Sequence, residues 1–169
     1  MDRFKKAFAY LLIEILRNYN YNMLSRLRVK LYRVLGASIG NDVKIKSGVI
    51  IEFPEKLIIG NSTSIQHNCY ISAYGKIIIG SNVSIAHSVS ILSSTHEYEG
   101  DVIIRETPLK LLNVNIQDNV WIGMKSSIVG VTICSGSVVG ANSYVNRDTT
   151  ENEVVGGSPA RHIKYRETK

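Results

Sequence analysis

The chain has 169 residues, of which 44% are hydrophobic and 20% charged, a composition that predicts one folded domain with a buried core. Residues 1–36 hold eight Lys and Arg against Asp2 and Glu14, whereas the other 133 residues carry twelve basic and twelve acidic side chains. The whole net charge of +6 therefore lies at the N-terminus, and the basic pI does not indicate nucleic-acid binding. Cys69 and Cys134 are too few for a disulfide framework.

Residues 1–36 are predicted to form two amphipathic helices, separated at Asn18–Asn22. The first has Phe4, Phe8, Leu11, Leu12, Ile15 and Leu16 on one face, and the second has Leu24, Leu27, Leu31, Val34 and Leu35. One interpretation is a cap on the end of a repeat domain. The other is a basic face on an anionic membrane, where each Lys or Arg contributes about 1 kcal/mol.

The apolar run Ala7–Leu16 is far shorter than the roughly 20 residues that span a bilayer. It also lacks the small-residue cleavage site of a secretory signal. We therefore expect a cytoplasmic protein, peripheral at the inner face of the membrane if the second interpretation holds.

Residues 37–150 contain a repeat with a period of six. Its anchors are Ile39, Ile45, Ile51, Ile59, Ile65, Ile71, Ile79, Ile85, Ile91, Ile116, Ile122, Ile128, Ile133, Val139 and Val145. Neither a helix nor an ordinary strand repeats at six. The spacing departs from six only after Ile51, Ile71, Ile91 and Ile128, which is every third anchor. A three-sided coil of eighteen residues predicts this pattern, because one corner tolerates insertions without breaking stacked strands. Five coils are expected.

Two further columns agree with this coil. Small or β-branched residues stand four positions after the anchors: Val43, Val49, Thr63, Cys69, Val83, Val89, Val120, Ser126, Ser137 and Ser143. Residues that tolerate a left-handed backbone stand three positions after, with Lys125 as an exception: Asp42, Gly48, Ser62, Asn68, Asn82, Asn119, Gly136 and Asn142. The first column is expected inside the coil and the second at its corners.

The hexads Ile59–Ser64, Ile79–Ser84 and Val120–Gly123 resemble those of the hexapeptide-repeat acyltransferases, in the maltose/galactoside and xenobiotic acetyltransferase branch. The resemblance covers roughly residues 36–166 and extends to polysaccharide-biosynthesis O-acetyltransferases. It implies a mainly β fold, a left-handed parallel β-helix, and a homotrimer with active sites between subunits. The resulting division is a helical segment 1–36, a β-helix 37–150 with a long loop 92–115, and a C-terminal tail 151–169 for CoA binding and capping.

The long loop opens with Ser93-Ser94-Thr95-His96-Glu97-Tyr98. A thioester is already activated, so attack by a hydroxyl needs chiefly a base, and neutral imidazole suits this near pH 7. The resemblance assigns that role to His96, although Thr95 replaces the small residue often found before it. Glu106 is the preferred group to orient His96, with Glu97 or a backbone carbonyl as alternatives.

The resemblance also implies a site for acetyl-CoA. The segment Val155–Lys164 is similar to the family's C-terminal signature, in which Arg161 and Lys164 meet the cofactor's phosphates. Further positions expected to contact CoA are Ala86, Met124, Ala141, Asn146 and Arg147, the first three through main chain, and Trp121 as an aromatic wall or a subunit contact. Met124 replaces a Ser of some members, which affects a side-chain contact only.

Three positions are expected to meet the acceptor. Gln66 stands where the family commonly has an Asn, Tyr74 where a sugar-contacting Asp can stand, and Glu52 at an insertion before the coil. These departures predict an acceptor other than a simple galactoside or maltose. His67 and His87 are expected to stack in consecutive coils, as imidazoles at a trimer surface or, alternatively, as a metal pair. A β-helix zinc enzyme of the gamma-type carbonic anhydrase kind needs three converging His ligands, and the chain lacks that family's close His pair, so no metal is expected.

The sequence therefore favours an acetyl-CoA-dependent O-acetyltransferase that acts on a hydroxyl of a sugar or glycan precursor. An N-acetyltransferase of a nucleotide-linked amino sugar needs the same base and the same CoA site. A non-catalytic trimeric scaffold is a third interpretation, against which His96, Arg161 and Lys164 argue.

Overall fold

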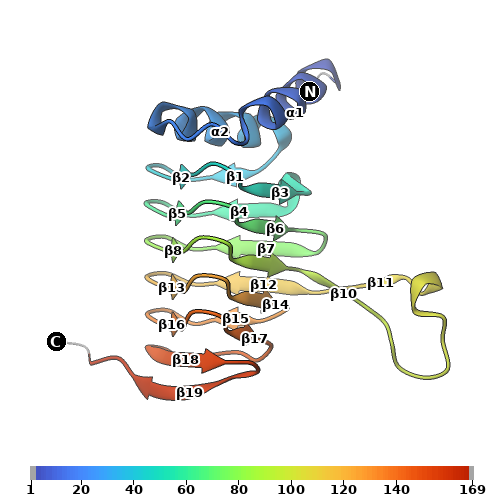
Figure 1. The fold of residues 1–169 in the computed structure, drawn as a ribbon, viewed down its shortest axis with the longest axis vertical. Helices are drawn as coiled ribbons and strands as arrows, with labels where there is room; N and C mark the ends of the chain where they lie inside the picture. The colour runs from blue at the N-terminus through green and yellow to red at the C-terminus, as the bar shows by residue number, and fades with distance from the viewer. Residues whose placement is uncertain (1–2, 168–169) are drawn as a thin grey trace.

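The computed structural model describes residues 3–167, which form a three-sided parallel β-solenoid with two helices at one end (Figure 1). Sheet A contains β1 (Ser38–Ile39), β4 (Leu57–Ile59), β7 (Lys76–Ile79), β12 (Asn113–Ile116) and β15 (Thr132–Ile133). Sheet B contains β2 (Lys44–Ile45), β5 (Ser64–Ile65), β8 (Ser84–Ile85), β13 (Trp121–Ile122), β16 (Val138–Val139), β18 (Glu153–Gly157) and β19 (Ala160–Tyr165). Sheet C contains β3 (Ile50–Glu52), β6 (Tyr70–Ser72), β9 (Ser90–Leu92), β14 (Ser127–Val129) and β17 (Tyr144–Val145).

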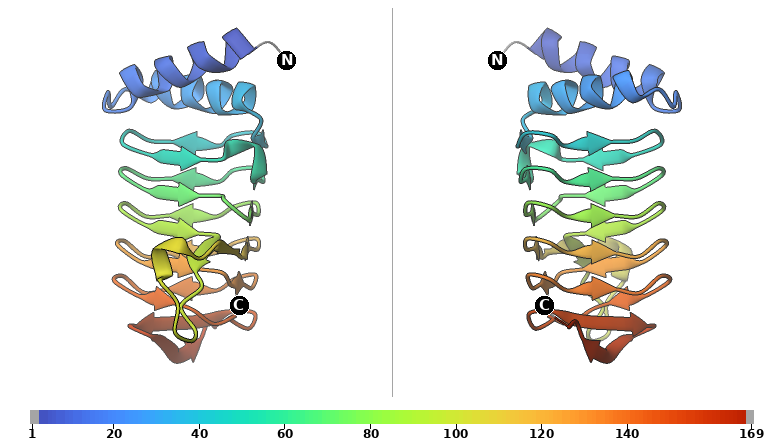
Figure 2. Two further views of the ribbon diagram at one scale, coloured as in Figure 1. Left: turned by 90° about the vertical axis from the view of Figure 1, so that its right-hand side faces the viewer. Right: turned by 90° about the vertical axis from the view of Figure 1, so that its left-hand side faces the viewer.

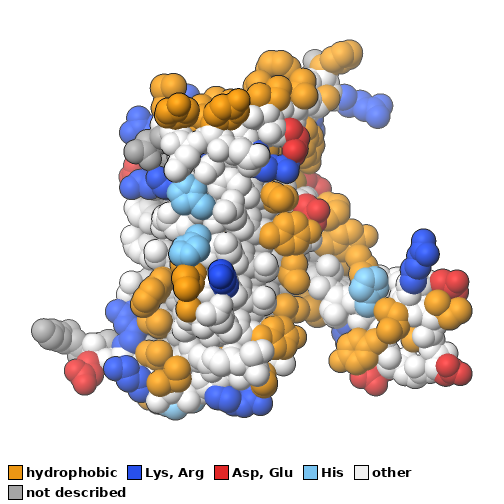
Figure 3. Space-filling view, in the orientation of Figure 1, with side chains coloured by type: hydrophobic (Ala, Val, Ile, Leu, Met, Phe, Trp, Pro, Cys, Tyr) orange, Lys and Arg blue, Asp and Glu red, His pale blue; other side chains and the backbone are white. Residues whose placement is uncertain are grey.

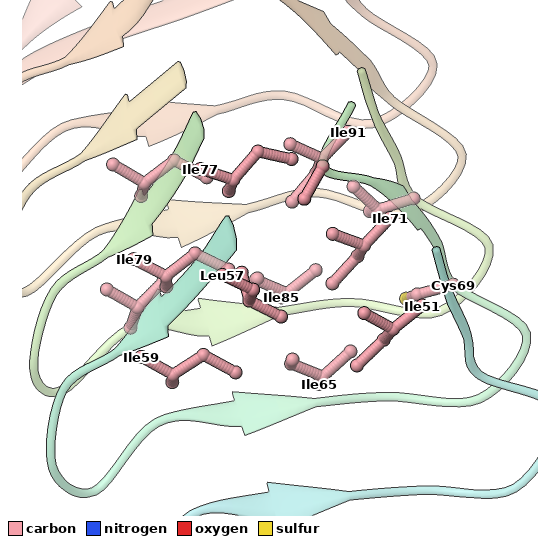
Figure 4. Close-up of a cluster of buried hydrophobic side chains, with 14 of the residues drawn as sticks. Ile51, Leu57, Ile59, Ile65, Cys69, Ile71, Ile77, Ile79, Ile85 and Ile91 are labelled. Carbon is pink, nitrogen blue, oxygen red and sulfur yellow. The ribbon is translucent and has the colours of Figure 1, made fainter. Parts of the chain in front are cut away.

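The predicted anchors are the residues that stack inside the solenoid (Figure 4). Ile59 pairs with Ile39 and Ile79 in sheet A, and Ile65 pairs with Ile85 in sheet B. None of the fifteen anchors is more than 8% exposed. The small and β-branched column four positions later is also buried, from Val43 to Ser143. The period of six is thus confirmed as one hexad per face.

The corners use left-handed backbone as expected. All nine residues of the corner column have φ between 54° and 73°. Lys125 is among them with φ 57°, so the coil imposes this conformation even on a side chain that disfavours it.

The number of turns differs from the expectation of five. Five complete turns are followed by β18, which pairs in parallel with β16 and places Val155 on Val139 as the start of a sixth. Val155 stands ten positions after Val145, so this strand lies outside the period of six. The segment expected as a tail is therefore partly solenoid, closed by the antiparallel strand β19.

The N-terminal segment forms α1 (Arg3–Leu16) and α2 (Asn22–Leu35), and α2 lies on the first coil (Figure 2). The open edge of that coil has backbone groups without a neighbouring strand. Ser25 Oγ accepts a hydrogen bond from the Ile45 amide at 2.9 Å, and Arg33 donates to the carbonyls of Ile39 and Gly40. Through these bonds α2 covers the open edge of the first coil.

Arg28 is a buried part of this cap, at 3% exposure. Its guanidinium donates to the carbonyl oxygens of Leu16 at 2.8 Å and Tyr19 at 2.5 Å, in the connection between the two helices. Within residues 3–167 no helix is long and apolar enough to cross a bilayer.

Candidate active site

His96 lies in a hairpin that leaves the solenoid at the corner between sheets C and A. The hairpin pairs β10 (Ser94–His96) with β11 (Leu109–Leu111) in antiparallel register and continues into a short 3-10 helix, η2 (Ile104–Glu106). It stands away from the body of the chain (Figures 1 and 2). The predicted loop 92–115 is slightly shorter in the structure, because β9 extends to Leu92 and β12 begins at Asn113.

The root of the hairpin is fixed to the coil by Ser93. Its hydroxyl donates to the Ser72 carbonyl at 2.9 Å and accepts from the Gly75 amide at 2.9 Å, and the side chain is fully buried. A Cβ on Gly75 would lie 2.0 Å from the Leu112 carbonyl oxygen, so the two branches of the chain pass too closely for any other residue. The imidazole three residues further on is thus carried by a rigid root.

The groups expected to orient His96 do not contact it within one chain. His96, Glu106 and the hairpin tip are exposed, and the His96 imidazole has no hydrogen-bond partner among residues 3–167. Glu97 bonds through its carbonyl, which accepts from Thr107 Oγ1 at 3.0 Å. The orienting role of Glu106 stays a prediction.

The hairpin carries a large exposed apolar surface. Its exposed members are Tyr98, Val102, Ile103, Ile104, Leu109 and Leu111, with exposures from 37% to 66%. Figure 3 shows hydrophobic side chains on the projecting part of the molecule. A two-stranded hairpin is only marginally stable in water without a covering surface, and such patches mark protein contacts.

The residues expected to contact CoA through main chain occupy a different corner from the hairpin, the one between sheets B and C. Ala86, Met124 and Ala141 each follow a sheet B anchor by one or two residues in the third, fourth and fifth coils. Within residues 3–167 the amides of Met124 and Ala141 make no hydrogen bond, whereas the Ala86 amide donates to the Ile122 carbonyl at 3.0 Å. Two of the three therefore keep a free donor.

Three further positions continue this line on sheet B. Trp121 stands on the outer face of β13 and is 54% exposed, beside Ser84 and Val138. Arg161 and Lys164 lie exposed on β19, opposite Gly156 and Val154 of β18. The outer surface of sheet B thus carries one exposed aromatic ring, Trp121, and two cations, Arg161 and Lys164, on its last strand.

Arg147 and Asn146 lie elsewhere, after β17 at the corner between sheets C and A. Arg147 Nη2 donates to Glu153 Oε1 at 2.7 Å, and His162 Nδ1 lies 3.1 Å from the same oxygen. Burial alone would raise the pKa of Glu153, but bonds from Arg147, the Thr150 amide and His162 lower it to about 2. This cluster was missed in the sequence, because nothing in the spacing links residues 147, 153 and 162.

The three acceptor positions fall into two groups. Gln66 follows Ile65 at the corner between sheets B and C, one coil from Ala86. Glu52 and Tyr74 lie at the corner of the hairpin: Glu52 accepts from Tyr70 at 2.6 Å, and the Tyr74 ring packs edge-on against Phe53 at 4.8 Å. Glu52 also lines a groove of about 350 Å³ together with Tyr10 and Phe53.

The expected site is therefore divided over two corners of the same chain. His96, Glu52 and Tyr74 share one corner, while Gln66, Ala86 and Met124 share another. Sheet B and the hairpin lie on opposite sides of the solenoid (Figure 1). One chain does not bring the imidazole to its own line of CoA positions.

No group of three His, Cys, Asp or Glu side chains arranged to hold a metal occurs in the described part of the chain. His67 and His87 do lie in consecutive coils, and the Ser88 amide donates to the His67 carbonyl at 2.9 Å. His67 Nδ1 is 2.8 Å from Ser47 Oγ, which gives this imidazole a structural partner.

Comparison with known proteins agrees with the solenoid. The model for the hexapeptide repeat of succinyl-transferase matches residues 113–147. WcaF of Escherichia coli, described as a colanic acid biosynthesis acetyltransferase, is 32% identical over 146 residues, which cover 85% of this chain and 78% of that protein. A local match to a Schizosaccharomyces pombe protein described as an acetyltransferase, 42% identical over 79 residues, covers 46% of this chain but only 37% of that protein.

Two solved structures share nearly the whole fold. A hexapeptide-repeat acetyltransferase of Vibrio cholerae, complexed with acetyl coenzyme A, has a TM-score of 0.84 and 29% identity, covering 98% of this chain and 87% of that one. A galactoside acetyltransferase in complex with coenzyme A has a TM-score of 0.82 and 26% identity, covering 95% and 80%. The chain belongs to the hexapeptide-repeat acetyltransferases, in the branch of the galactoside, maltose and chloramphenicol enzymes. Within that branch it is a homologue of WcaF.

Proposed function

We propose that this protein is an acetyl-CoA-dependent O-acetyltransferase that transfers acetyl to a hydroxyl of a sugar or glycan precursor. The observation that carries the proposal is the hairpin with a fixed root at Ser93, which presents His96 away from its own chain's cofactor positions. Relatives with acetyl coenzyme A or coenzyme A bound share the fold, and a colanic acid biosynthesis relative aligns along most of the chain. These support both the cofactor and a saccharide acceptor.

We propose a homotrimer in which the hairpin of one chain reaches the sheet B side of the next. The apolar hairpin surface needs a cover, and the divided site needs a second chain to become complete. In this arrangement His96 of one subunit meets the line of Gln66, Ala86 and Met124 of its neighbour.

CoA would lie along that line, with its phosphates at Arg161 and Lys164 and its pantetheine arm passing Ala141 and Met124. The free amides of these two residues are suitable donors to the arm's carbonyl groups. The exposed face of Trp121 offers an apolar wall beside it. The thioester then lies near Ala86 and Gln66, where the acceptor must arrive.

In the reaction, His96 takes the proton of the acceptor hydroxyl as its oxygen attacks the thioester carbonyl. The resulting tetrahedral intermediate collapses with cleavage of the carbon–sulfur bond, and the thiolate of CoA receives the proton. The products are the acetyl ester and free CoA. His96 is exposed, so its ring is accessible to an acceptor from solvent.

The test is transfer by wild type and His96→Ala to a panel of sugars with either hydroxyl or amine acceptors, with release of the CoA thiol as the readout. Loss of general-base catalysis typically costs about 10²–10⁴ in rate. Glu99→Gln, in the same hairpin, is the matched control and should retain its rate. Near-native turnover by His96→Ala would remove the base assignment. Activity confined to amine acceptors would instead favour the N-acetyltransferase, and no activity with any acceptor would favour the scaffold.

We also propose contact of α1 with an anionic membrane. Phe4, Phe8, Leu11 and Ile15 form an outward stripe with exposures from 55% to 84%, at the end of the molecule with the net charge of +6. Anionic vesicles should sediment the full chain, but not Phe8→Gln/Leu11→Gln. Ile103→Gln is the control for loss of exposed apolar surface. Equal sedimentation of the stripe variant would leave α1 as a cap alone.

A further inference from the structure

A basic groove lies between α2 and the first coil. It has a volume of about 620 Å³ and is bounded by α2 on one side and by the segment from Gly40 to Lys46 on the other. Its cations are Arg26, Lys30, Arg33, Lys44 and Lys46, against the single acidic residue Asp42. The groove therefore has a formal excess of four positive charges.

These charges repel one another, and those of Arg26, Lys30 and Lys44 are not neutralised by an ion pair within residues 3–167. Arg26, Lys30 and Arg33 follow one side of α2 at spacings of four and three residues, where like charges destabilise a helix. None of the ion pairs within residues 3–167 involves Arg26, Lys30 or Lys44. A bound anion would remove this repulsion.

Part of the groove is held in place before any ligand binds. Arg33 Nε and Nη2 donate to the Ile39 carbonyl at 3.1 and 2.8 Å, and Nη2 donates to the Gly40 carbonyl at 2.6 Å. The guanidinium is thereby fixed at the groove wall. A fixed planar donor group loses little entropy when it binds phosphate.

One residue of the groove, Lys46, continues the line of residues proposed for catalysis. Lys46 follows Ile45 as Gln66 follows Ile65 and Ala86 follows Ile85, and these anchors pair in register. Neighbouring coils are about 4.8 Å apart, so Lys46 stands about 10 Å from the level of Ala86. That distance suits a sugar between the thioester and a group bound in the groove. The cations proposed for CoA, Arg161 and Lys164, lie on the last strand, at the far end of the solenoid.

We propose that the acceptor is a phosphate-bearing saccharide, and that this groove binds its phosphate or diphosphate group. The inference rests on the proposed function, because it places the sugar between the groove and the thioester. The excess of four positive charges favours a diphosphate over a neutral glycoside. The diphosphate can belong to a nucleotide-linked or an isoprenyl-linked sugar, and both present the same anionic group.

The experiment is calorimetric titration of the full chain, saturated with CoA so that the sites at Arg161 and Lys164 are occupied. The probes are inorganic pyrophosphate, UDP, and farnesyl diphosphate in neutral detergent micelles. Lys30→Gln/Lys44→Gln removes one charge from each wall without touching the bonds of Arg33. Lys5→Gln with Lys76→Gln, both exposed and outside the groove, is the control for the same loss of charge.

We expect wild type to bind pyrophosphate and at least one other probe, and the groove variant to bind them about tenfold more weakly, with losses growing at low salt. Tighter binding of UDP than of pyrophosphate identifies a nucleotide link, and tighter binding of farnesyl diphosphate identifies a lipid link. Equal affinities of wild type, groove variant and control would overturn the inference, as would no binding of any probe. Since CoA binding and the rate of His96→Ala are measured separately, such a failure leaves the proposed acetyl transfer standing.

Discussion

Replacing Glu153 by Gln should weaken the C-terminal hairpin that carries Arg161 and Lys164. The Glu153 side chain is 5% exposed and binds Arg147, His162 and the Thr150 amide, which together lower its pKa from 4.5 to about 2. Each pKa unit corresponds to about 1.4 kcal/mol, so the ionised carboxylate contributes on the order of 3 kcal/mol. Because the pKa is lower in the folded state, this stability is present above pH 4.5 and is lost as the pH falls towards 2.

Amide hydrogen exchange of β18 and β19 measures this effect locally, which suits a solenoid whose ends open independently. At pH 7 the opening equilibrium of Glu153→Gln should exceed that of wild type by roughly a hundredfold. Near pH 2.5 the two proteins should differ little, since wild type has then lost most of the same contribution. Glu151→Gln, exposed and two residues away, should match wild type at both pH values. A difference between Glu153→Gln and wild type that stays constant from pH 7 to pH 2.5 would refute the reasoning.

Three further predictions follow from the cap, the tail and the hairpin. Arg28→Met leaves the carbonyls of Leu16 and Tyr19 without their donor and should lower the free energy of unfolding by about 2–4 kcal/mol. The control Arg26→Met should change it by less than about 0.5 kcal/mol. Equal melting temperatures of the two variants would contradict the stabilising role of Arg28 in the cap. Arg161→Ala and Lys164→Ala should each weaken CoA binding, more so at low salt, and unchanged affinity in calorimetry would make β19 a closing strand only. Sedimentation at micromolar concentration should give a trimer, and a monomer would remove the shared site.

The sequence predicted the coil more completely than the site, for a physical reason. Ile65 and its equivalents repeat because each fills the same environment in every turn, so the pattern in the chain is the packing itself. Lys125 was an exception in the corner column, yet it adopts the same backbone, because the turns above and below dictate the corner. The strand of Val155 was missed, since Val155 stands ten positions after the preceding anchor, Val145.

Contacts between side chains of different strands could not be predicted from the repeat pattern. The meeting of Arg147, Glu153 and His162 follows from how β19 returns along β18, which no periodicity records. The charged residues of the second helix were treated as one face, whereas Arg28 is buried in the cap and Lys30 lines the groove. His96 was assigned from the family resemblance and its place after the third coil, whereas the imidazole has no hydrogen-bond partner among residues 3–167 that would identify its orienting group.

Because Ser93 is fixed to the coil, changes of sequence in the hairpin need not affect the packing of the coils. Two buried bonds of one hydroxyl close the coil before the hairpin begins, so the strands above and below keep their register whatever follows. Residues 97–108 can then be lengthened, shortened or exchanged while the stacked core and the opposite corner stay as they are. In a scaffold of this kind, a change of sequence in the hairpin needs no compensating change in the stacked core of the coils.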